Sequence, residues 1–206
     1  MKVLERGREA MNTNYSAQNF ITVFENVLSA ELCQNLIEKF EANPQCHKPE
    51  RKTSKEDHWQ MQFTQVNFVE NETFKQEEKQ LQPLFLQAIN AYKKEHDIQP
   101  HQWPEQFKLE PIRMKRYLPN TEDGFGEHVD VSDYASARRF LVFFIYLNDD
   151  FDGGETSFKQ FNIKVKPKQG SLILFPPMWN WLHQAHAVTG NNPKYIVGSY
   201  MHYVQK

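Results

Sequence analysis

The stretch FGEHVDVSDYASARRFLVFFIYLNDDFDGGETSF, residues 125–158, carries the strongest structural signals in the chain. His128 and Asp130 lie two positions apart, so an extended backbone points both side chains to the same face. Residues 140–147 then form a continuous apolar run, which predicts a strand that is buried on both faces. The Gly153-Gly154-Glu155-Thr156 segment that follows predicts a tight turn, because glycine allows unusual backbone angles.

The paired imidazole and carboxylate supply two ligands of a 2-His-1-carboxylate site, which binds non-haem Fe(II) and leaves coordination positions open. The third ligand must come from a distant segment, and His183 and His186 follow Asp130 by 53 and 56 residues. The His-x-Asp pattern alone is weak, because a chain with eight histidines forms such pairs by chance. The buried strand that follows, and the basic Lys194 that opens the last predicted strand, favour the metal site.

The whole chain, residues 1–206, predicts a single domain that is mainly β. Residues 1–18 are polar and are expected to be a loose segment, and residues 19–106 are expected to form a supporting region. That region includes a strand within 19–27, an amphipathic helix after Ser29 and a second helix within 71–96, where Pro83 indicates a kink or a late start. Residues 44–59 are polar and predict a mobile loop. Residues 107–206 contain five β-rich segments separated by turn residues, which predicts a sandwich or barrel.

The composition excludes several classes of function. The formal net charge of -2 and the lack of a basic tract argue against nucleic acid and against an anionic membrane surface. No run approaches the roughly 18 apolar residues of a membrane span, and the N-terminus lacks a secretory signal pattern. Two cysteines form no disulfide framework, so we expect free thiols and a cytoplasmic protein; no signal for an oligomeric state is present.

Four segments in this order resemble the 2-oxoglutarate- and Fe(II)-dependent oxygenases, and specifically their prolyl-4-hydroxylase-like branch. The segments are MKRYLPNTEDGFGEHVDV, FLVFFIYLNDDFDGGETSF, VKPKQGSLILFPP and HQAHAVTGNNPKYIVGSY, which cover the chain from about residue 112 onward. The resemblance implies a double-stranded β-helix, or jelly roll, with N-terminal helices packed on one sheet. It also implies Fe(II), 2-oxoglutarate and O2 as cofactor and co-substrates, with ascorbate as an accessory reductant.

The same resemblance assigns roles to individual residues. His128 and Asp130 match the first two iron ligands, and His183 is favoured over His186 because it stands four residues before Ala187-Val188, where the family has a Pro-Val pair. A second group of residues would bind the co-substrate. Lys194, eleven residues after His183, would bind the distal carboxylate of 2-oxoglutarate, Tyr146 would donate to the same carboxylate and Tyr117 would line its pocket.

The sequence therefore predicts a hydroxylase that releases succinate and CO2 and acts on a prolyl or other amino-acid side chain, in a peptide or protein or as a free amino acid. Asp130 favours hydroxylation, since halogenating relatives replace this carboxylate by a small residue. Two alternatives are a non-catalytic jelly-roll binding module and a cupin-like metal enzyme that does not use 2-oxoglutarate. Residues 43–60 and 131–137 are the loops in which substrate specificity is expected to reside.

Overall fold

The computed structural model describes residues 19–54 and 59–204, and the predicted loose segment 1–18 lies outside them. The helices are α2 (Ala30–Glu41) and α3 (Lys75–Glu95), with 3-10 turns η3 (Pro44–Cys46), η4 (Glu72–Phe74), η5 (Pro100–Gln102) and η6 (Lys159–Phe161). The strands are β1 (Thr22–Phe24), β2 (Lys48–Ser54), β3 (Trp59–Asn67), β4 (Phe107–Leu109), β5 (Arg113–Tyr117), β6 (Gly124–His128), β7 (Arg139–Tyr146), β8 (Asp152–Gly153), β9 (Thr156–Phe158), β10 (Ile163–Val165), β11 (Leu172–Phe175), β12 (His183–Ala185), β13 (Val188–Thr189) and β14 (Lys194–Tyr203).

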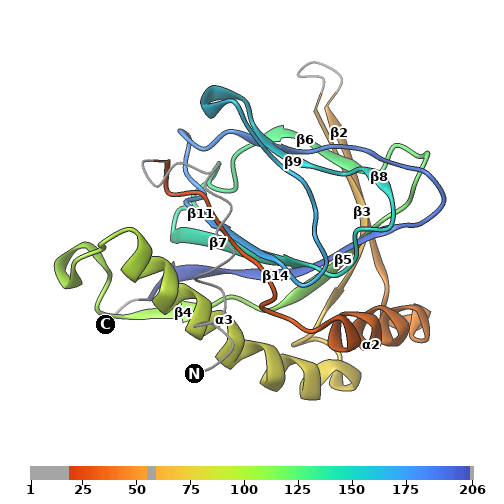
Figure 1. The fold of residues 1–206 in the computed structure, drawn as a ribbon, viewed down its shortest axis with the longest axis horizontal. Helices are drawn as coiled ribbons and strands as arrows, with labels where there is room; N and C mark the ends of the chain where they lie inside the picture. Colours follow the sequence, from red (N-terminus) through yellow and green to blue (C-terminus); the bar gives the residue numbers. More distant parts are fainter. Residues whose placement is uncertain (1–18, 55–58, 205–206) are drawn as a thin grey trace.

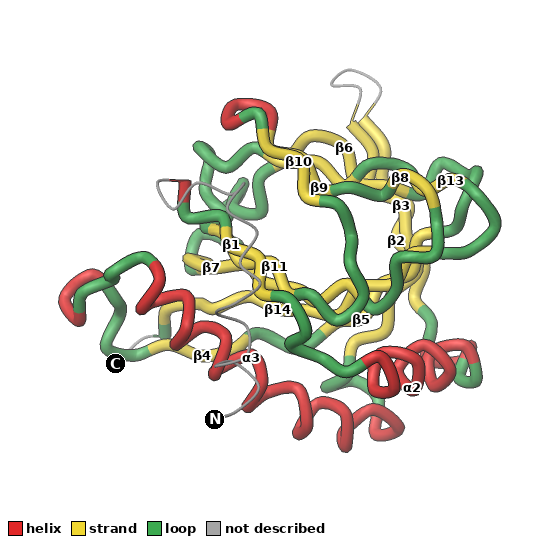
Figure 2. Tube along the Cα trace, in the orientation of Figure 1, coloured by secondary structure: helices red, strands yellow, loops and turns green. Residues whose placement is uncertain are grey.

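Twelve of these strands form one sheet that curls into an open barrel (Figures 1 and 2). The strand order is β1-β11-β7-β14-β5-β3-β6-β12-β9-β10, with β2 paired to β3 and β4 paired to β14. Figure 2 shows β11, β7, β14 and β5 in one layer and β6, β9 and β10 in the opposite layer, with β3 between the two layers. Helices α2 and α3 lie outside the first layer, so the predicted jelly roll with helices packed on one sheet is confirmed.

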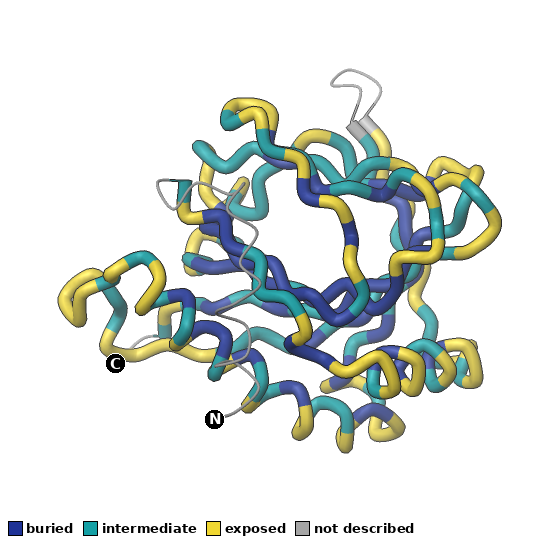
Figure 3. The backbone as a smooth tube through the Cα atoms, viewed as in Figure 1, coloured by how far each residue is buried: buried dark blue, intermediate teal, exposed yellow. Residues whose placement is uncertain are grey.

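Strand β7 is buried on both faces, as its continuous apolar run predicts. Leu141, Phe143 and Ile145 belong to the core that lies between the sheet and the two helices. Val142 and Tyr146 alternate with them and belong to a second core inside the barrel. Figure 3 shows this burial along the layer that the helices cover. One strand therefore separates the structural core from the interior that holds the candidate site.

Helix α2 begins where the sequence predicts. The Ser29 hydroxyl accepts a hydrogen bond from the Leu32 amide at 3.2 Å, which satisfies one of the free donors of the first turn. Cys33, Leu36 and Phe40 form its buried stripe.

Helix α3 begins at Lys75, ahead of Pro83, so the expectation of a late start at this proline is wrong. Pro83 lies at an exposed position, where the carbonyl that loses its helical hydrogen bond can meet water. No helix of the described residues is long and apolar enough to cross a membrane.

The predicted loop at residues 44–59 is largely a β-hairpin, and this expectation is wrong. β2 pairs with β3 from Lys48 opposite Gln65 to Ser54 opposite Trp59, and the connecting residues 55–58 lie outside the described part. β3 in turn pairs with β5 and β6, and its Phe63 is buried inside the barrel. The polar β2 sequence is stable as a strand because β3 supplies its hydrogen-bond partners, which local sequence does not reveal.

Candidate metal centre and its cavity

The barrel interior brings together three of the predicted ligands. His128 ends β6, Asp130 follows two residues later, and His183 opens β12 directly opposite His128 in the antiparallel pairing. The His183 Nε2 lies 3.4 Å from Asp130 Oδ2, and the His128 Nε2 lies 3.9 Å from Asp130 Oδ1. The ligand atoms of the three residues all lie within 4.8 Å of one another.

Hydrogen bonds fix which ring nitrogens face the centre of this cluster. His128 Nδ1 contacts the Gly126 carbonyl at 2.7 Å, and His183 Nδ1 contacts the Trp181 carbonyl at 2.9 Å. A carbonyl can only accept, so each Nδ1 carries a proton and each Nε2 is left to face the cluster. Burial lowers the pKa of His128 to about 3, and the neighbouring His183 acts in the same direction, which keeps the His128 imidazole neutral.

The cluster therefore consists of acceptors that face one another. Asp130 Oδ2 is buried and has no hydrogen-bond partner among the described residues. The pKa of Asp130 is lowered although its burial acts to raise it, because His183, His128 and the Tyr200 hydroxyl favour the charged form. Two imidazole Nε2 atoms and a carboxylate at this spacing fit a divalent cation, and the donor set is the one that non-haem Fe(II) uses.

His186, the alternative third ligand, does not join the cluster. Its Nε2 lies 2.8 Å from the Ser157 hydroxyl, and the residue follows the end of β12 and is half-buried. The geometry therefore favours His183 as the third ligand.

The three residues expected at the co-substrate also lie together. The Lys194 Nζ is buried and lies 5.3 Å from the centre of the Tyr117 ring and 5.4 Å from that of Tyr146. It donates a hydrogen bond to the Gly154 carbonyl at 2.5 Å. Burial lowers the pKa of Lys194 to about 7, with Glu155 acting in the opposite direction. The Tyr146 hydroxyl lies 2.8 Å from the Thr156 hydroxyl, so Thr156 orients this phenol.

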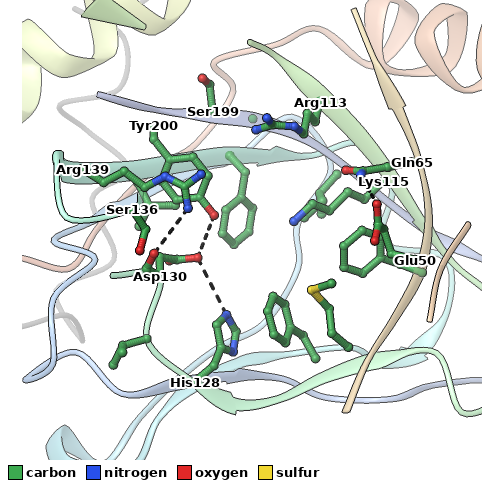
Figure 4. Close-up of a pocket in the computed structure, with 18 of the residues that line it drawn as sticks. Glu50, Gln65, Arg113, Lys115, His128, Asp130, Ser136, Arg139, Ser199 and Tyr200 are labelled. Atoms are coloured by element: carbon green, nitrogen blue, oxygen red, sulfur yellow. Dashed lines mark hydrogen bonds and ion pairs between the residues drawn. The ribbon is translucent and has the colours of Figure 1, made fainter. Parts of the chain in front are cut away.

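A cavity of about 600 Å³ opens beside the cluster (Figure 4). His128 and Asp130 lie on its wall, together with polar side chains from several strands. These polar lining residues are Glu50, Lys52, Gln65, Arg113, Lys115, Glu127, Ser132, Asp133, Ser136, Arg139, Ser199 and Tyr200. Glu50, Lys52 and Gln65 come from the β2–β3 hairpin, and Ser132, Asp133 and Ser136 come from the predicted specificity loop 131–137.

The sequence did not identify Tyr200 or Lys115 as site residues. The Tyr200 hydroxyl donates a hydrogen bond to Asp130 Oδ1 at 2.7 Å, and the Arg139 guanidinium lies 3.9 Å from the centre of the Tyr200 ring. Arg139 is ion-paired with Glu110. Tyr200 lies in β14 and Lys115 lies in β5. Side chains in a strand point alternately into and out of the barrel, and the sequence alone does not show which set points inward.

The two tryptophans that precede His183 lie apart from the cavity lining. Trp179 is 82% exposed, and the Trp181 Nε1 donates a hydrogen bond to the Asn19 carbonyl at 2.7 Å.

Known proteins share this core. The model of the 2OG-Fe(II) oxygenase superfamily matches residues 112–202. A mimivirus protein (Acanthamoeba polyphaga mimivirus) named "Putative prolyl 4-hydroxylase" is 34% identical over 87 residues, which cover 37% of this chain and 35% of the relative. The match thus spans about a third of that relative's length.

Solved structures share the fold over nearly the whole chain. The 2OG complex of the viral collagen prolyl hydroxylase of Paramecium bursaria Chlorella virus-1 has a TM-score of 0.62 at 19% identity, covering 90% of this chain and 97% of that one. A Trichoplax adhaerens prolyl hydroxylase in complex with a hypoxia inducible factor peptide fragment has a TM-score of 0.68 at 12% identity, covering 98% and 92%.

The family match includes His128, Asp130, His183 and both inward-facing lysines, Lys115 and Lys194. It confirms the predicted dependence on Fe(II) and 2-oxoglutarate, the two groups in the family's description. Residues 112–202 thus resemble the 2OG-Fe(II) oxygenase superfamily, and they carry the three-residue cluster that a metal of this kind would need.

Proposed function

We propose that the chain is a 2-oxoglutarate-dependent Fe(II) hydroxylase that acts on a prolyl or other amino-acid side chain, in a peptide or protein or as a free amino acid, in the cytoplasm. The observation that carries the proposal is the cluster of His128, Asp130 and His183 beside an open cavity. Two of the similar structures are a collagen prolyl hydroxylase and a prolyl hydroxylase with a bound peptide, which supports an amino-acid side chain as the target.

In this proposal, separate groups of residues bind the metal and the co-substrate. His128, Asp130 and His183 would hold the metal on one face, and Tyr200 keeps the Asp130 carboxylate in place. When bound, the iron and 2-oxoglutarate supply the oxidising chemistry, in which 2-oxoglutarate is converted to succinate and CO2. Lys194 would hold the distal carboxylate of 2-oxoglutarate, because it is a buried cation with no carboxylate partner among the described residues. Tyr117 and Tyr146 flank its ammonium group and exclude water from it.

Both alternatives, the binding module and the cupin-like enzyme, fit these observations less well than the hydroxylase does. A binding module that had lost catalysis would be favoured by an exposed Lys194 and by a cavity that does not reach His128. Lys194 is 1% exposed and His128 lies on the cavity wall. A cupin-like enzyme that does not use 2-oxoglutarate would have no need for a buried lysine next to two phenols.

The test is succinate formation from 2-oxoglutarate by the full chain with Fe(II), O2 and ascorbate. We expect succinate from the wild type and none above background from His128→Ala or Asp130→Ala, with His186→Ala as the matched histidine control. Metal content is measured on each preparation. A wild type that binds metal and still forms no succinate, with or without added prolyl peptides, would overturn the proposal.

A further inference from the structure

The cavity beside the metal cluster is lined by four lysine and arginine side chains. The charges of three of them are compensated by a carboxylate or by water. Arg139 donates from Nε and Nη2 to the Glu110 carboxylate at 2.8 and 2.9 Å. Arg113 Nη1 lies 3.7 Å from the same carboxylate. Lys52 is exposed on β2, where water solvates its charge. The remaining cation, Lys115, is only partly exposed and forms no ion pair with an acidic side chain among the described residues.

Lys115 lies in the middle of β5 and points into the cavity (Figure 4). Its Nζ lies 4.6 Å from the centre of the Phe63 ring. It makes no ion pair with any carboxylate of residues 19–54 and 59–204. Glu50 lines the same cavity, but its Oε1 accepts a hydrogen bond from Gln65 Nε2 at 2.9 Å. Burial lowers the pKa of Lys115 to about 8, with Asp130 acting in the opposite direction. The charges of Asp130 and Glu50 act on this half-buried ammonium, but among the described residues neither carboxylate forms an ion pair with it.

The co-substrate does not account for this second lysine. In the proposed function, Lys194 binds the distal carboxylate of 2-oxoglutarate and the metal binds the other end. Both carboxylates of 2-oxoglutarate therefore already have a cationic partner. In the sheet, Tyr117 lies opposite Lys194 and Lys115 lies opposite Ile196, which moves Lys115 two residues along β5 from the co-substrate anchor. Lys115 lines the open cavity, whereas Lys194, Tyr117 and Tyr146 do not.

We propose that Lys115 binds a carboxylate of the primary substrate and thereby selects acidic substrates for hydroxylation beside the metal cluster. The inference rests on the proposed function and narrows its substrate class. The carboxylate could belong to a free or terminal amino acid or to an acidic side chain next to the hydroxylated residue. Either source would give the ammonium group a charge-assisted hydrogen bond inside a cavity that screens it less than bulk water does.

Four probes separate the two sources. N-acetyl-L-proline and N-acetyl-L-prolinamide differ only in a terminal carboxylate. The peptides acetyl-Gly-Glu-Pro-Gly-amide and acetyl-Gly-Gln-Pro-Gly-amide differ only in a side-chain carboxylate. Binding is measured by calorimetry on the full chain loaded with Mn(II) and 2-oxoglutarate, so that no turnover is needed. We expect the acidic member of at least one pair to bind about tenfold more tightly or better, the scale of a charged hydrogen bond.

Variants of Lys115 test whether this lysine causes the preference. Lys115→Met should abolish the preference and Lys115→Arg should restore it at least in part, while Lys52→Met, which removes a cation from the exposed rim, should keep it. Lys115→Gln is a second neutral variant in case Lys115→Met does not fold, as judged by Mn(II) binding and thermal unfolding. The dissociation constant of 2-oxoglutarate is measured on each variant.

Three results overturn the inference. The first is equal binding within both probe pairs, which includes no binding by any probe. The second is a preference that survives in Lys115→Met, or that is lost equally in Lys115→Arg, since packing would then be the cause. The third is a loss of 2-oxoglutarate affinity in Lys115→Met as large as that in Lys194→Met, which would assign Lys115 to the co-substrate. Failure of the proposed function is distinct, because it appears as absent succinate formation by the wild type.

Discussion

The Tyr200 hydroxyl donates a 2.7 Å hydrogen bond to Asp130 Oδ1, which leaves the Oδ2 atom of the same carboxylate facing His183 Nε2 at 3.4 Å. The carboxylate is thus held by one oxygen and presented to the metal position by the other. The Arg139 guanidinium packs on the Tyr200 ring and donates to the Asp130 carbonyl at 3.3 Å. Glu110, in the connection between β4 and β5, holds Arg139 in turn, so a chain of contacts links this connection to the metal ligand Asp130.

Tyr200→Phe removes the hydroxyl and keeps the ring. We expect the affinity for Mn(II) to fall about 10- to 100-fold, the usual effect of losing a hydrogen bond to a metal ligand. Titration calorimetry of the protein with Mn(II) measures it. Tyr203→Phe, at a half-exposed position of the same strand, is the matched control and should bind Mn(II) as the wild type does. Equal affinities in the two variants would show that Tyr200 does not hold Asp130 in its binding position.

His183→Ala and His186→Ala separate the two candidate third ligands. His183 Nε2 faces Asp130, whereas His186 Nε2 contacts Ser157. We expect His183→Ala to lose Mn(II) binding and His186→Ala to keep it within about threefold, since one of three ligands normally contributes several kcal/mol. The reverse outcome would exchange the two assignments.

Lys194→Met should stabilise the metal-free protein. Burial lowers the pKa of Lys194 from 10.5 to about 7, so the unfolded state binds more protons than the folded state between these pH values. Stability is therefore reduced at or below about pH 7, and this loss is relieved as the pH rises toward 10.5. The upper limit of the effect is about 5 kcal/mol, from the shift at 1.36 kcal/mol per unit.

Urea unfolding of wild type and Lys194→Met at pH 7 and at pH 9.5 measures this difference. We expect the variant to be more stable at pH 7 and the gap to narrow at pH 9.5. The same variant should bind 2-oxoglutarate far more weakly, because it lacks the buried cation. A Lys194→Met protein that is less stable than wild type at pH 7 would show that the ammonium group is well compensated in the folded state.

Gly170→Ala should destabilise the junction between α2 and the barrel. Gly170 has a φ of +75°, and a Cβ placed there would lie 2.1 Å from the Leu28 carbonyl oxygen. The Gly170 carbonyl also accepts hydrogen bonds from the Val27 and Leu28 amides at 2.9 and 3.1 Å, which fix the entry to α2. We expect a loss of about 2–4 kcal/mol in the free energy of unfolding, from backbone strain and displaced contacts. Gly126→Ala, with no positive φ, serves as the control.

The C-terminal half could be predicted from sequence because its signals are local. The apolar run of β7, the His-x-Asp pair and the glycine turn each have a distinct pattern, and the ordered motifs added the distal histidine and Lys194. The hairpin β2–β3 could not be predicted, since its polar first strand depends on pairing with residues up to 17 positions away, from Lys48 to Gln65.

The site was predicted less completely than the fold. The contact of the Tyr146 hydroxyl with Thr156 depends on how the barrel closes, so local sequence does not reveal it. Donation by Tyr146 to the co-substrate stays a prediction. Lys115 looked like one of several basic residues in β5, and only its position on the cavity wall and the pairing of Arg113 and Arg139 with Glu110 distinguish it. Charge alone does not reveal which cation lacks a partner.

Strand β14 sets a length scale for the co-substrate. Lys194 and Tyr200 belong to this one strand, which is hydrogen-bonded to β5 on one side and to β7 on the other. The separation between the Lys194 ammonium and the carboxylate that Tyr200 holds is thus fixed by backbone geometry and cannot adjust through a loop. We therefore expect the site to select 2-oxo acids by chain length. Oxaloacetate, one carbon shorter, and 2-oxoadipate, one carbon longer, would each fail to contact the metal and Lys194 at the same time.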